Sequence, residues 1–305
     1  MDPSPRSSPD EQRQSPPTCS RVLVTGALGT VGREVLRALA GLGIPARAAD
    51  RSVERARAAL GPEADVTALD LLDPSTFPSA LEGCDALFLL RPSTLSDVKP
   101  TLNRLVDAAV AGGVRHIVFL SVAGADANTL IPHHAVERHL EQSRARWTVL
   151  RPGFFAQHLG DAYRRDILED GRIYVPAGSG SVAFVDVRDL AEVAARVFAA
   201  PEVHAGKAYT LTGPESLSFL EVAQALTELR GVHVRYQPAS SLGYMAHLWR
   251  RGLSAPQALV QTMLLVGLRQ GQAERVDPTL PQLLGRPSRS LLDYVRDHAS
   301  LWSPS

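Results

Sequence analysis

The sequence predicts an α/β fold built on a doubly wound parallel sheet of the Rossmann type. Three observations lead to this prediction. Short strand patterns alternate with helix patterns over residues 21–152. Several of the strand patterns are apolar throughout, which is typical of parallel strands that are buried on both faces. Segment 21–32, RVLVTGALGTVG, runs from a strand pattern through three closely spaced glycines into a helix pattern.

The three glycines, Gly26, Gly29 and Gly32, have separate tasks if the unit is a strand, a tight turn and a helix. One makes the turn, one lets the backbone approach a pyrophosphate, and one lets the helix pack closely on the strand. The N-terminus of the helix then offers free N–H groups and the positive end of its dipole to the phosphates. Three glycines alone also fit an ordinary strand-to-helix turn, so the interpretation depends on the rest of the chain.

The first half continues with the same alternation. Ser52 and Pro132 stand where an N-cap and a first helical residue are expected, and Gly83 and the glycine pair at 112–113 follow helix patterns as terminators. The predicted strands are 46–50, 65–69, 85–90, 116–120 and 147–150, and the predicted helices are 33–40, 52–60, 73–83, 100–111 and 132–143.

The pattern becomes mixed beyond residue 152. The predicted organisation is a disordered tail at 1–20, rich in proline and serine, a dinucleotide-binding Rossmann core at 21–152, and a smaller C-terminal α/β substrate lobe at 153–305. Some elements of that lobe are expected to return to the main sheet. Its helices are predicted near 156–168 and over 189–199, 219–229, 242–250, 255–268 and 290–297, with short strands around 173 and 183 and at 208–211 and 232–236.

The composition is that of an ordinary globular protein, because 45% of the 305 residues are hydrophobic and 21% are charged. Lysine plus arginine equals aspartate plus glutamate at 32 each, so the whole chain has no net field that would attract nucleic acid or an anionic membrane. No apolar run is long enough for a secretory signal or a membrane span. The two cysteines, Cys19 and Cys84, indicate neither a disulfide framework nor a metal site, and they fit a cytoplasmic protein.

Acidic residues end two of the predicted strands, at the edge where ligands bind to open α/β sheets. Asp50 lies about twenty residues beyond the glycines, where a carboxylate accepts hydrogen bonds from the adenosine ribose. A carboxylate there repels a 2′-phosphate, so NAD(H) is favoured. The adjacent Arg51 argues for NADP(H), because an arginine pairs with that phosphate. Asp70 fits a place at the adenine, and for both aspartates a turn or capping role is the alternative.

Several longer stretches, together with the glycines, give the chain a family resemblance. It resembles the NmrA-like, atypical branch of the short-chain dehydrogenase/reductase superfamily from about residue 21 to near residue 298. The resemblance implies an NAD(P)-binding Rossmann protein. The stretches that carry it are GALGTVG from Gly26, ALDLLDPSTFPSALEGCDALFLL from Ala68, AAVAGGVRHIVFLSVAGAD from Ala108, WTVLRPGFF from Trp147, VAFVDVRDLAEVA from Val182 and YTLTGPESLSFLEVA from Tyr209.

By this resemblance the cofactor would lie along one edge of the sheet, and each part of it would meet a different segment. Ser121 matches a serine at the end of the fifth strand, close to the nicotinamide. The other implied contacts are Gly26, Leu28, Gly29, Thr30 and Val31 at the pyrophosphate, Asp50 and Arg51 at the adenosine ribose, Asp70 and Leu71 at the adenine, Leu90, Arg91 and Pro92 at the nicotinamide ribose, and Pro152, Gly153 and Phe154 at the nicotinamide ring.

The chain departs from the superfamily at the catalytic residues. The usual YxxxK pair does not follow Ser121, and where many NmrA-like reductases have a pattern close to HKxxE this chain has HHAVE at 133–137. His134 therefore stands in the lysine position. A histidine could hydrogen-bond the nicotinamide ribose and donate a proton near neutral pH. The alternative is a polar helix face, on which His133 and His134 lie four residues before Glu137 and Arg138.

The leading functional hypothesis is an NAD(P)H-dependent oxidoreductase that reduces an aromatic or conjugated carbonyl compound, such as a quinone. Ser121 would orient the accepting oxygen, and His134 or a relayed water would supply the proton. The missing tyrosine and lysine keep a second hypothesis open, a non-catalytic NAD(P)-binding sensor or regulator of the NmrA type. An isomerase or cyclase that retains the cofactor is a third.

The substrate pocket is expected to come from the irregular segments 153–175 and 240–268, whose aromatic side chains suit an apolar, ring-shaped ligand. Amphipathic helix packing is the alternative for these side chains. The chain is expected to be a monomer or a homodimer. The predicted pocket residues are Phe155, His158, Tyr163, Tyr244 and Trp249.

Overall fold

The computed structural model describes residues 20–302, and its main feature is a seven-stranded parallel sheet in the order β11-β6-β5-β4-β1-β2-β3. The predicted doubly wound α/β class is confirmed. The strand order reverses beside β1, and parallel strands all end at one edge, so the gap between β1 and β4 is the expected ligand position. The strands are β1 Val22–Val24, β2 Ala46–Asp50, β3 Val66–Ala68, β4 Ala86–Leu90, β5 His116–Leu120, β6 Arg146–Pro152 and β11 Lys207–Leu211.

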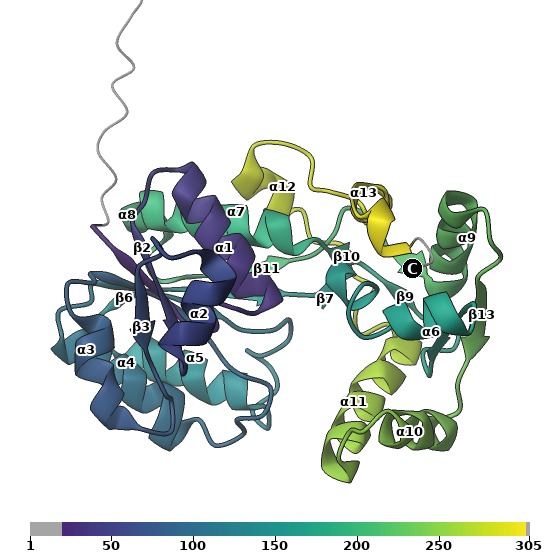
Figure 1. Ribbon diagram of the computed structural model, residues 1–305, viewed down its shortest axis with the longest axis horizontal. Helices are drawn as coiled ribbons and strands as arrows, with labels where there is room; N and C mark the ends of the chain where they lie inside the picture. The colour runs from purple at the N-terminus through teal and green to yellow at the C-terminus, as the bar shows by residue number, and fades with distance from the viewer. Residues whose placement is uncertain (1–19, 303–305) are drawn as a thin grey trace, which may run out of the picture.

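Helices cover both faces of this sheet (Figure 1). Alternate residues of the apolar strands supply two separate cores: Phe88 and Val118 face one, and Leu87 and Ile117 face the other. Burial on both faces explains why these strands are apolar throughout. One face carries α1 Thr30–Gly41, α7 Val187–Ala199 and α12 Thr279–Leu284, the other carries α3 Phe77–Leu81, α4 Arg104–Ala111 and α5 Pro132–Gln142, and α2 Val53–Leu60 packs beside β2 and β3.

The C-terminal half forms a second body with its own core around Phe184, Phe219 and Trp302 (Figure 1). Three two-stranded pairs hold it: β7 Phe154–Phe155 with β10 Phe184–Val185, β9 Ser181–Val182 with β12 Leu217–Ser218, and β8 Arg172–Val175 with β13 Arg235–Pro238. Its helices are α6 Arg164–Glu169, α9 Phe219–Arg230, α10 Ser241–Arg250, α11 Ala255–Gly267 and α13 Leu291–Asp297, with short turns at Ala156–His158, Leu268–Gln270 and Ala299–Trp302. The chain returns to the main sheet through α7, α8 Pro201–His204, β11 and α12.

Two predicted elements of this half are wrong in extent. The helix expected near 156–168 is divided, because the chain turns around Gly160, where a side chain would meet the Tyr294 hydroxyl. The strand expected at 232–236 begins only at Arg235. The short helix α12 was missed altogether. The predicted disordered tail and Cys19 lie, apart from Ser20, outside the described residues, and Cys84 is buried.

Candidate cofactor and active site

The glycine turn between β1 and α1 gives each glycine a distinct role. Gly26 has a φ of 61°, a left-handed conformation that glycine adopts without strain. Gly29 is the N-cap of α1, and its N–H donates to the Gly26 carbonyl over 3.0 Å. A Cβ on Gly32 would overlap that carbonyl oxygen and the Ala27 backbone. Gly26, Gly29 and Thr30 are exposed, so the first turn of α1 is open to a phosphate.

Thr25, which sequence reasoning missed, fastens this turn to the neighbouring strand. Its side chain is 2% exposed, and its backbone N–H donates to the Phe88 carbonyl over 3.0 Å. Its hydroxyl donates to the same carbonyl over 3.1 Å and accepts from the Leu90 N–H over 2.8 Å. The Leu90 to Pro92 segment, predicted at the nicotinamide ribose, is thereby held beside the glycines. A threonine directly before the first glycine was the available signal.

The adenosine end contains two arginines in different states. Asp50 accepts two hydrogen bonds from Arg55, at 2.7 and 2.8 Å, and one from the Ser52 N–H at 2.9 Å. Its negative charge is therefore already paired. Arg51 is exposed, and within residues 20–302 its guanidinium makes no hydrogen bond or ion pair. Asp70 accepts from the Leu72 N–H over 3.0 Å, which stabilises the turn at the half-buried Leu71.

A buried ionic network lies at the nicotinamide end. The Ser121 hydroxyl donates to a carboxylate oxygen of Glu137, and both side chains are 2% exposed. Arg151, at the end of β6, donates to Glu137 through Nη2 over 2.6 Å and through Nε over 3.1 Å, and its Nη1 reaches Asp126 over 3.1 Å. Burial alone would lower the pKa of Arg151, but the hydrogen bonds and charge of Glu137 raise it above the ordinary value. The network therefore holds the hydrogen of the Ser121 hydroxyl in a hydrogen bond to Glu137.

The two histidines at the start of α5 contact different segments. His133 Nε2 accepts from Arg91 Nε over 3.2 Å, and burial together with Arg91 lowers the pKa of His133 to about 4. His133 is therefore neutral at pH 7. His134 Nδ1 lies 2.8 Å from the carbonyl oxygen of Ala125, so Nδ1 donates, and Nε2 has no partner among residues 20–302. Neither makes the helix-surface pair considered from the sequence, because Glu137 binds Arg151 and Arg138 binds Glu141.

Only part of the predicted substrate pocket gathers in one place. Phe154 and Phe155 follow the end of β6, and the His158 ring lies 4.6 and 5.8 Å from their ring centres. Burial lowers the pKa of His158, although its ring also hydrogen-bonds the Phe155 carbonyl. The other three side chains lie elsewhere: Tyr163 and Tyr244 are buried in the C-terminal core, and Trp249 is 71% exposed on α10.

One contact joins the glycine turn to the C-terminal half. The Thr30 hydroxyl donates to a carboxylate oxygen of Asp161 over 3.3 Å. Thr30 is the first residue of α1, so Asp161 stands beside the predicted pyrophosphate position. Sequence reasoning did not single out Asp161, because it lies in an irregular turn of the C-terminal half.

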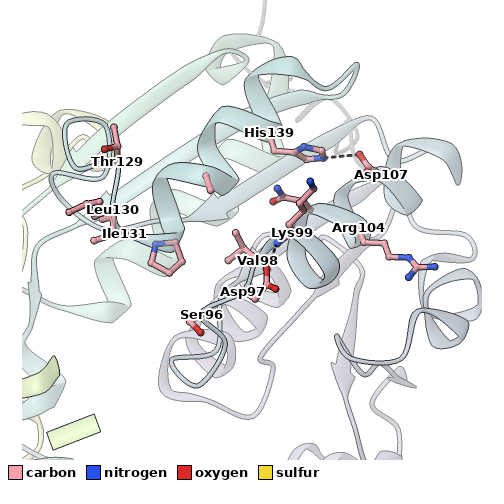
Figure 2. A pocket seen from close by; sticks show the side chains of 13 residues that line it. Ser96, Asp97, Val98, Lys99, Arg104, Asp107, Thr129, Leu130, Ile131 and His139 are labelled. Atoms are coloured by element: carbon pink, nitrogen blue, oxygen red, sulfur yellow. Dashed lines mark hydrogen bonds and ion pairs between the residues drawn. The ribbon is translucent and has the colours of Figure 1, made fainter. Parts of the chain in front are cut away.

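A cavity of about 600 Å³ lies away from the glycine turn, between α4 and α5 (Figure 2). His139 Nε2 and Asp107 Oδ1 close one side of it, 2.7 Å apart. It contains none of the predicted site residues, although Pro132 in its wall directly precedes His133. The lining of this cavity therefore does not include the predicted cofactor contacts. Among residues 20–302 no cluster of three or more histidine, cysteine, aspartate or glutamate side chains could hold a metal ion.

The comparisons with known proteins agree with this geometry. A family model described as NAD(P)H-binding matches residues 26–201, which is more than half of the chain. The chain belongs to this NAD(P)H-binding family. The NAD(P)H azoreductase of Xenophilus azovorans is 34% identical over 285 residues, which cover 92% of this chain and 98% of that protein. The NAD(P)-binding character implied by the predicted resemblance is thereby confirmed, and the NmrA structure in complex with NAD, 18% identical with a TM-score of 0.72 over 92% of this chain, has the same fold.

Two solved reductases share the whole fold with this family member. The quinone oxidoreductase of Escherichia coli complexed with NADPH is 30% identical with a TM-score of 0.80, covering 91% of this chain and 99% of that chain. The triphenylmethane reductase of Citrobacter sp. complexed with NADP(H) is 27% identical with a TM-score of 0.79 and the same coverage. The protein is an NAD(P)H-dependent oxidoreductase, and the sequence-based prediction of this activity is confirmed.

Proposed function

We propose that this oxidoreductase uses NADPH to reduce apolar, ring-shaped compounds with conjugated double bonds, such as quinones. The aromatic side chains at the end of β6 support the substrate class. Phe154 and Phe155 are half-buried, follow the strand at its carboxyl end, and flank His158. Flat ligands stack on such rings. The relatives named above are a quinone oxidoreductase, a triphenylmethane reductase and an azoreductase, and all three names point to conjugated compounds.

The charges at the adenosine end support NADPH. The sequence alone favoured NAD(H) because of Asp50, but Arg55 already neutralises this carboxylate. Arg51 is exposed and has no partner within residues 20–302, so it is available to a 2′-phosphate. This single observation carries the cofactor preference. The two solved relatives were complexed with NADPH or NADP(H).

The nicotinamide end divides its tasks between positioning and proton supply. The cofactor, when bound, supplies the hydride. The sequence predicts that Ser121 orients the accepting oxygen, which would need the hydrogen of its hydroxyl. This hydroxyl donates its hydrogen bond to Glu137 and can only accept a further one, so we propose that Ser121 positions this end of the site without donating to the substrate. His133 is neutral and already accepts from Arg91. His134 uses Nδ1 for the Ala125 carbonyl, so Nε2 is the ring nitrogen left for the substrate. We propose that the protonated form of His134 gives its Nε2 proton to the substrate atom that becomes negative when the hydride arrives, and that the neutral ring then regains a proton from water.

Steady-state oxidation of NADPH and NADH with a panel of quinones and enones tests the proposal. We expect NADPH to have the higher kcat/KM with every accepted substrate. Changing His134 to Gln, which keeps a hydrogen-bonding side chain but cannot carry a proton at neutral pH, should lower kcat about a hundredfold and leave the Kd of NADPH unchanged. Tight NADPH binding without turnover of any quinone or enone would contradict the proposed substrate class.

A further inference from the structure

The helix α11 exposes apolar side chains on the side that faces away from the protein core. Its inner side is formed by Ala258, Thr262 and Leu265, which are buried. On the outer side Leu259, Val260, Met263 and Leu264 are 48%, 58%, 66% and 66% exposed. These four residues, here called the apolar stripe, repeat at a spacing of four and so form one face of the helix. A helix that is apolar all round is normally covered on all sides.

The stripe belongs to a helical hairpin that projects from the C-terminal half (Figure 1). Helices α10 and α11 pack against each other, and Trp249, which is 71% exposed, lies near the end of α10. Segment 252–268, which includes all of α11, has no charged residue. Contiguous exposed apolar surface of this kind marks an interaction site.

The segment that contains the hairpin carries charged residues of one sign, although Asp166 of α6 contacts α10 and Glu274 directly follows the segment. Segment 229–273 contains five arginines and no aspartate or glutamate, although the whole chain is neutral. Arg251 is the one member that pairs with a carboxylate, that of Asp166. The other four have no carboxylate partner among residues 20–302, and three of them donate to backbone carbonyls within the lobe: Arg230, Arg250 and Arg269. The fourth is Arg235.

We propose that the α10–α11 hairpin docks on an anionic lipid surface, with the apolar stripe in the interface and the arginines at the headgroups. An exposed apolar helix face in a segment that carries arginines and no carboxylates is typical of helices that lie in a membrane interface. The thirteen residues of α11 extend about 20 Å, too short for a span of about 30 Å. In the described part of the chain no helix combines the length and apolarity that a membrane crossing requires.

Charge also argues against a second copy of the chain as the occupant. A symmetric dimer through the stripe would place the same cationic segment against itself, and like charges across an interface are repulsive. An anionic surface neutralises them instead. The inference does not depend on the reductase proposal, but the two fit together because apolar ring compounds concentrate in membranes.

Vesicle sedimentation with the full chain tests this docking. The vesicles are phosphatidylcholine alone, or phosphatidylcholine with roughly one third phosphatidylglycerol. We expect binding to the mixed vesicles only, and loss of binding at high salt. Met263→Glu with Leu264→Glu should weaken the binding at least about tenfold. The matched control is Val203→Glu with Leu220→Glu, which alters two exposed apolar residues outside the hairpin and should bind as the wild type does.

The arginines are tested separately, and folding is checked in each case. Arg235→Gln with Arg250→Gln should weaken binding and reduce its salt dependence, because two cations are lost. Circular dichroism melting shows whether the variants stay folded, and NADPH binding shows that the other half is intact. The proposal is overturned if wild-type protein does not bind the mixed vesicles. It is also overturned if light scattering shows a dimer that the Met263→Glu, Leu264→Glu variant dissociates.

Discussion

The two ends of the predicted cofactor site are built by different means. At the pyrophosphate end, a single segment of the chain forms the turn, and its geometry depends on backbone atoms of Gly26, Gly29 and Gly32. At the nicotinamide end, side chains from β4, β5, β6 and α5 meet through buried hydrogen bonds and ion pairs. A turn that is fixed by backbone shape is sensitive to one added carbon atom. A network of side chains is sensitive to the loss of one partner.

The largest effect is expected from Gly32→Ala at the backbone-built end. The new Cβ would overlap the Gly26 carbonyl oxygen and the Ala27 Cα. Both atoms belong to the turn that directly follows β1, so neither can move aside without disturbing that strand. We expect a loss of more than about 4 kcal/mol in the free energy of unfolding and no measurable NADPH binding. Urea unfolding and fluorescence titration measure the two effects. Gly41→Ala, at the other end of α1 with open space around it, is the control and should be neutral or slightly stabilising. Equal stability of the two variants would show that the turn tolerates a side chain.

The side-chain network should respond next most strongly, to Glu137→Ala. The change leaves the Arg151 guanidinium buried without its principal partner, and it removes the acceptor of the Ser121 hydroxyl hydrogen bond. Removing one member of a buried pair costs about 3 kcal/mol. Glu141→Ala on the same helix removes an exposed pair with Arg138, and it should cost less than about 0.5 kcal/mol. Urea unfolding compares the two variants. A cost for Glu137→Ala as small as that for Glu141→Ala would mean that the network does not hold this end together.

This contrast explains how much of the molecule could be predicted from sequence. The glycine turn and the strands of the first half were predicted because their signals are local: apolar runs, caps and glycines. The pair of Glu137 and Arg151 was not, because two charged residues fourteen positions apart look like exposed surface until the fold brings them together. Tyr163 and Tyr244 were predicted in the pocket from residue type alone, yet whether an aromatic ring lines a pocket or a core depends on tertiary packing.

Two histidines with lowered pKa values, His133 at the predicted nicotinamide end and His116 at the opposite end of β5, make the stability depend on pH. The pKa of His133 is about 4 in the folded protein and about 6.5 when unfolded, so the unfolded chain binds more protons between these values. Stability is therefore complete above pH 6.5 and falls as pH decreases toward 4. His133 alone should contribute a loss of about 2 kcal/mol between pH 8 and pH 5. The pKa of His116 is also lowered to about 4, mainly by burial. His116 therefore causes a further loss of stability over the same pH range.

His133→Gln separates the two histidines, because glutamine can accept from Arg91 but does not titrate. Urea unfolding gives the free energy of unfolding at pH 8 and at pH 5. The decrease between these two pH values should be about 2 kcal/mol smaller in the variant than in the wild type. His116 remains in both proteins, so part of the pH dependence should remain too. An unchanged difference between the two pH values would mean that His133 is not held neutral by its surroundings.

The smallest effect is expected at the adenosine end, where Arg51 is exposed and acts on the cofactor only. Arg51→Ala should raise the KM for NADPH about tenfold, which corresponds to about 1.4 kcal/mol, and leave the KM for NADH nearly unchanged because NADH has no 2′-phosphate. Arg57→Ala, an exposed change on α2, is the control and should affect neither cofactor. Stability should be unaltered, because Arg51 has no partner within residues 20–302. If both cofactors lose affinity equally, Arg51 contacts the adenosine that they share. The argument for NADPH from Arg51 would then fail, and the preference for NAD(H) that the sequence predicts from Asp50 would stand.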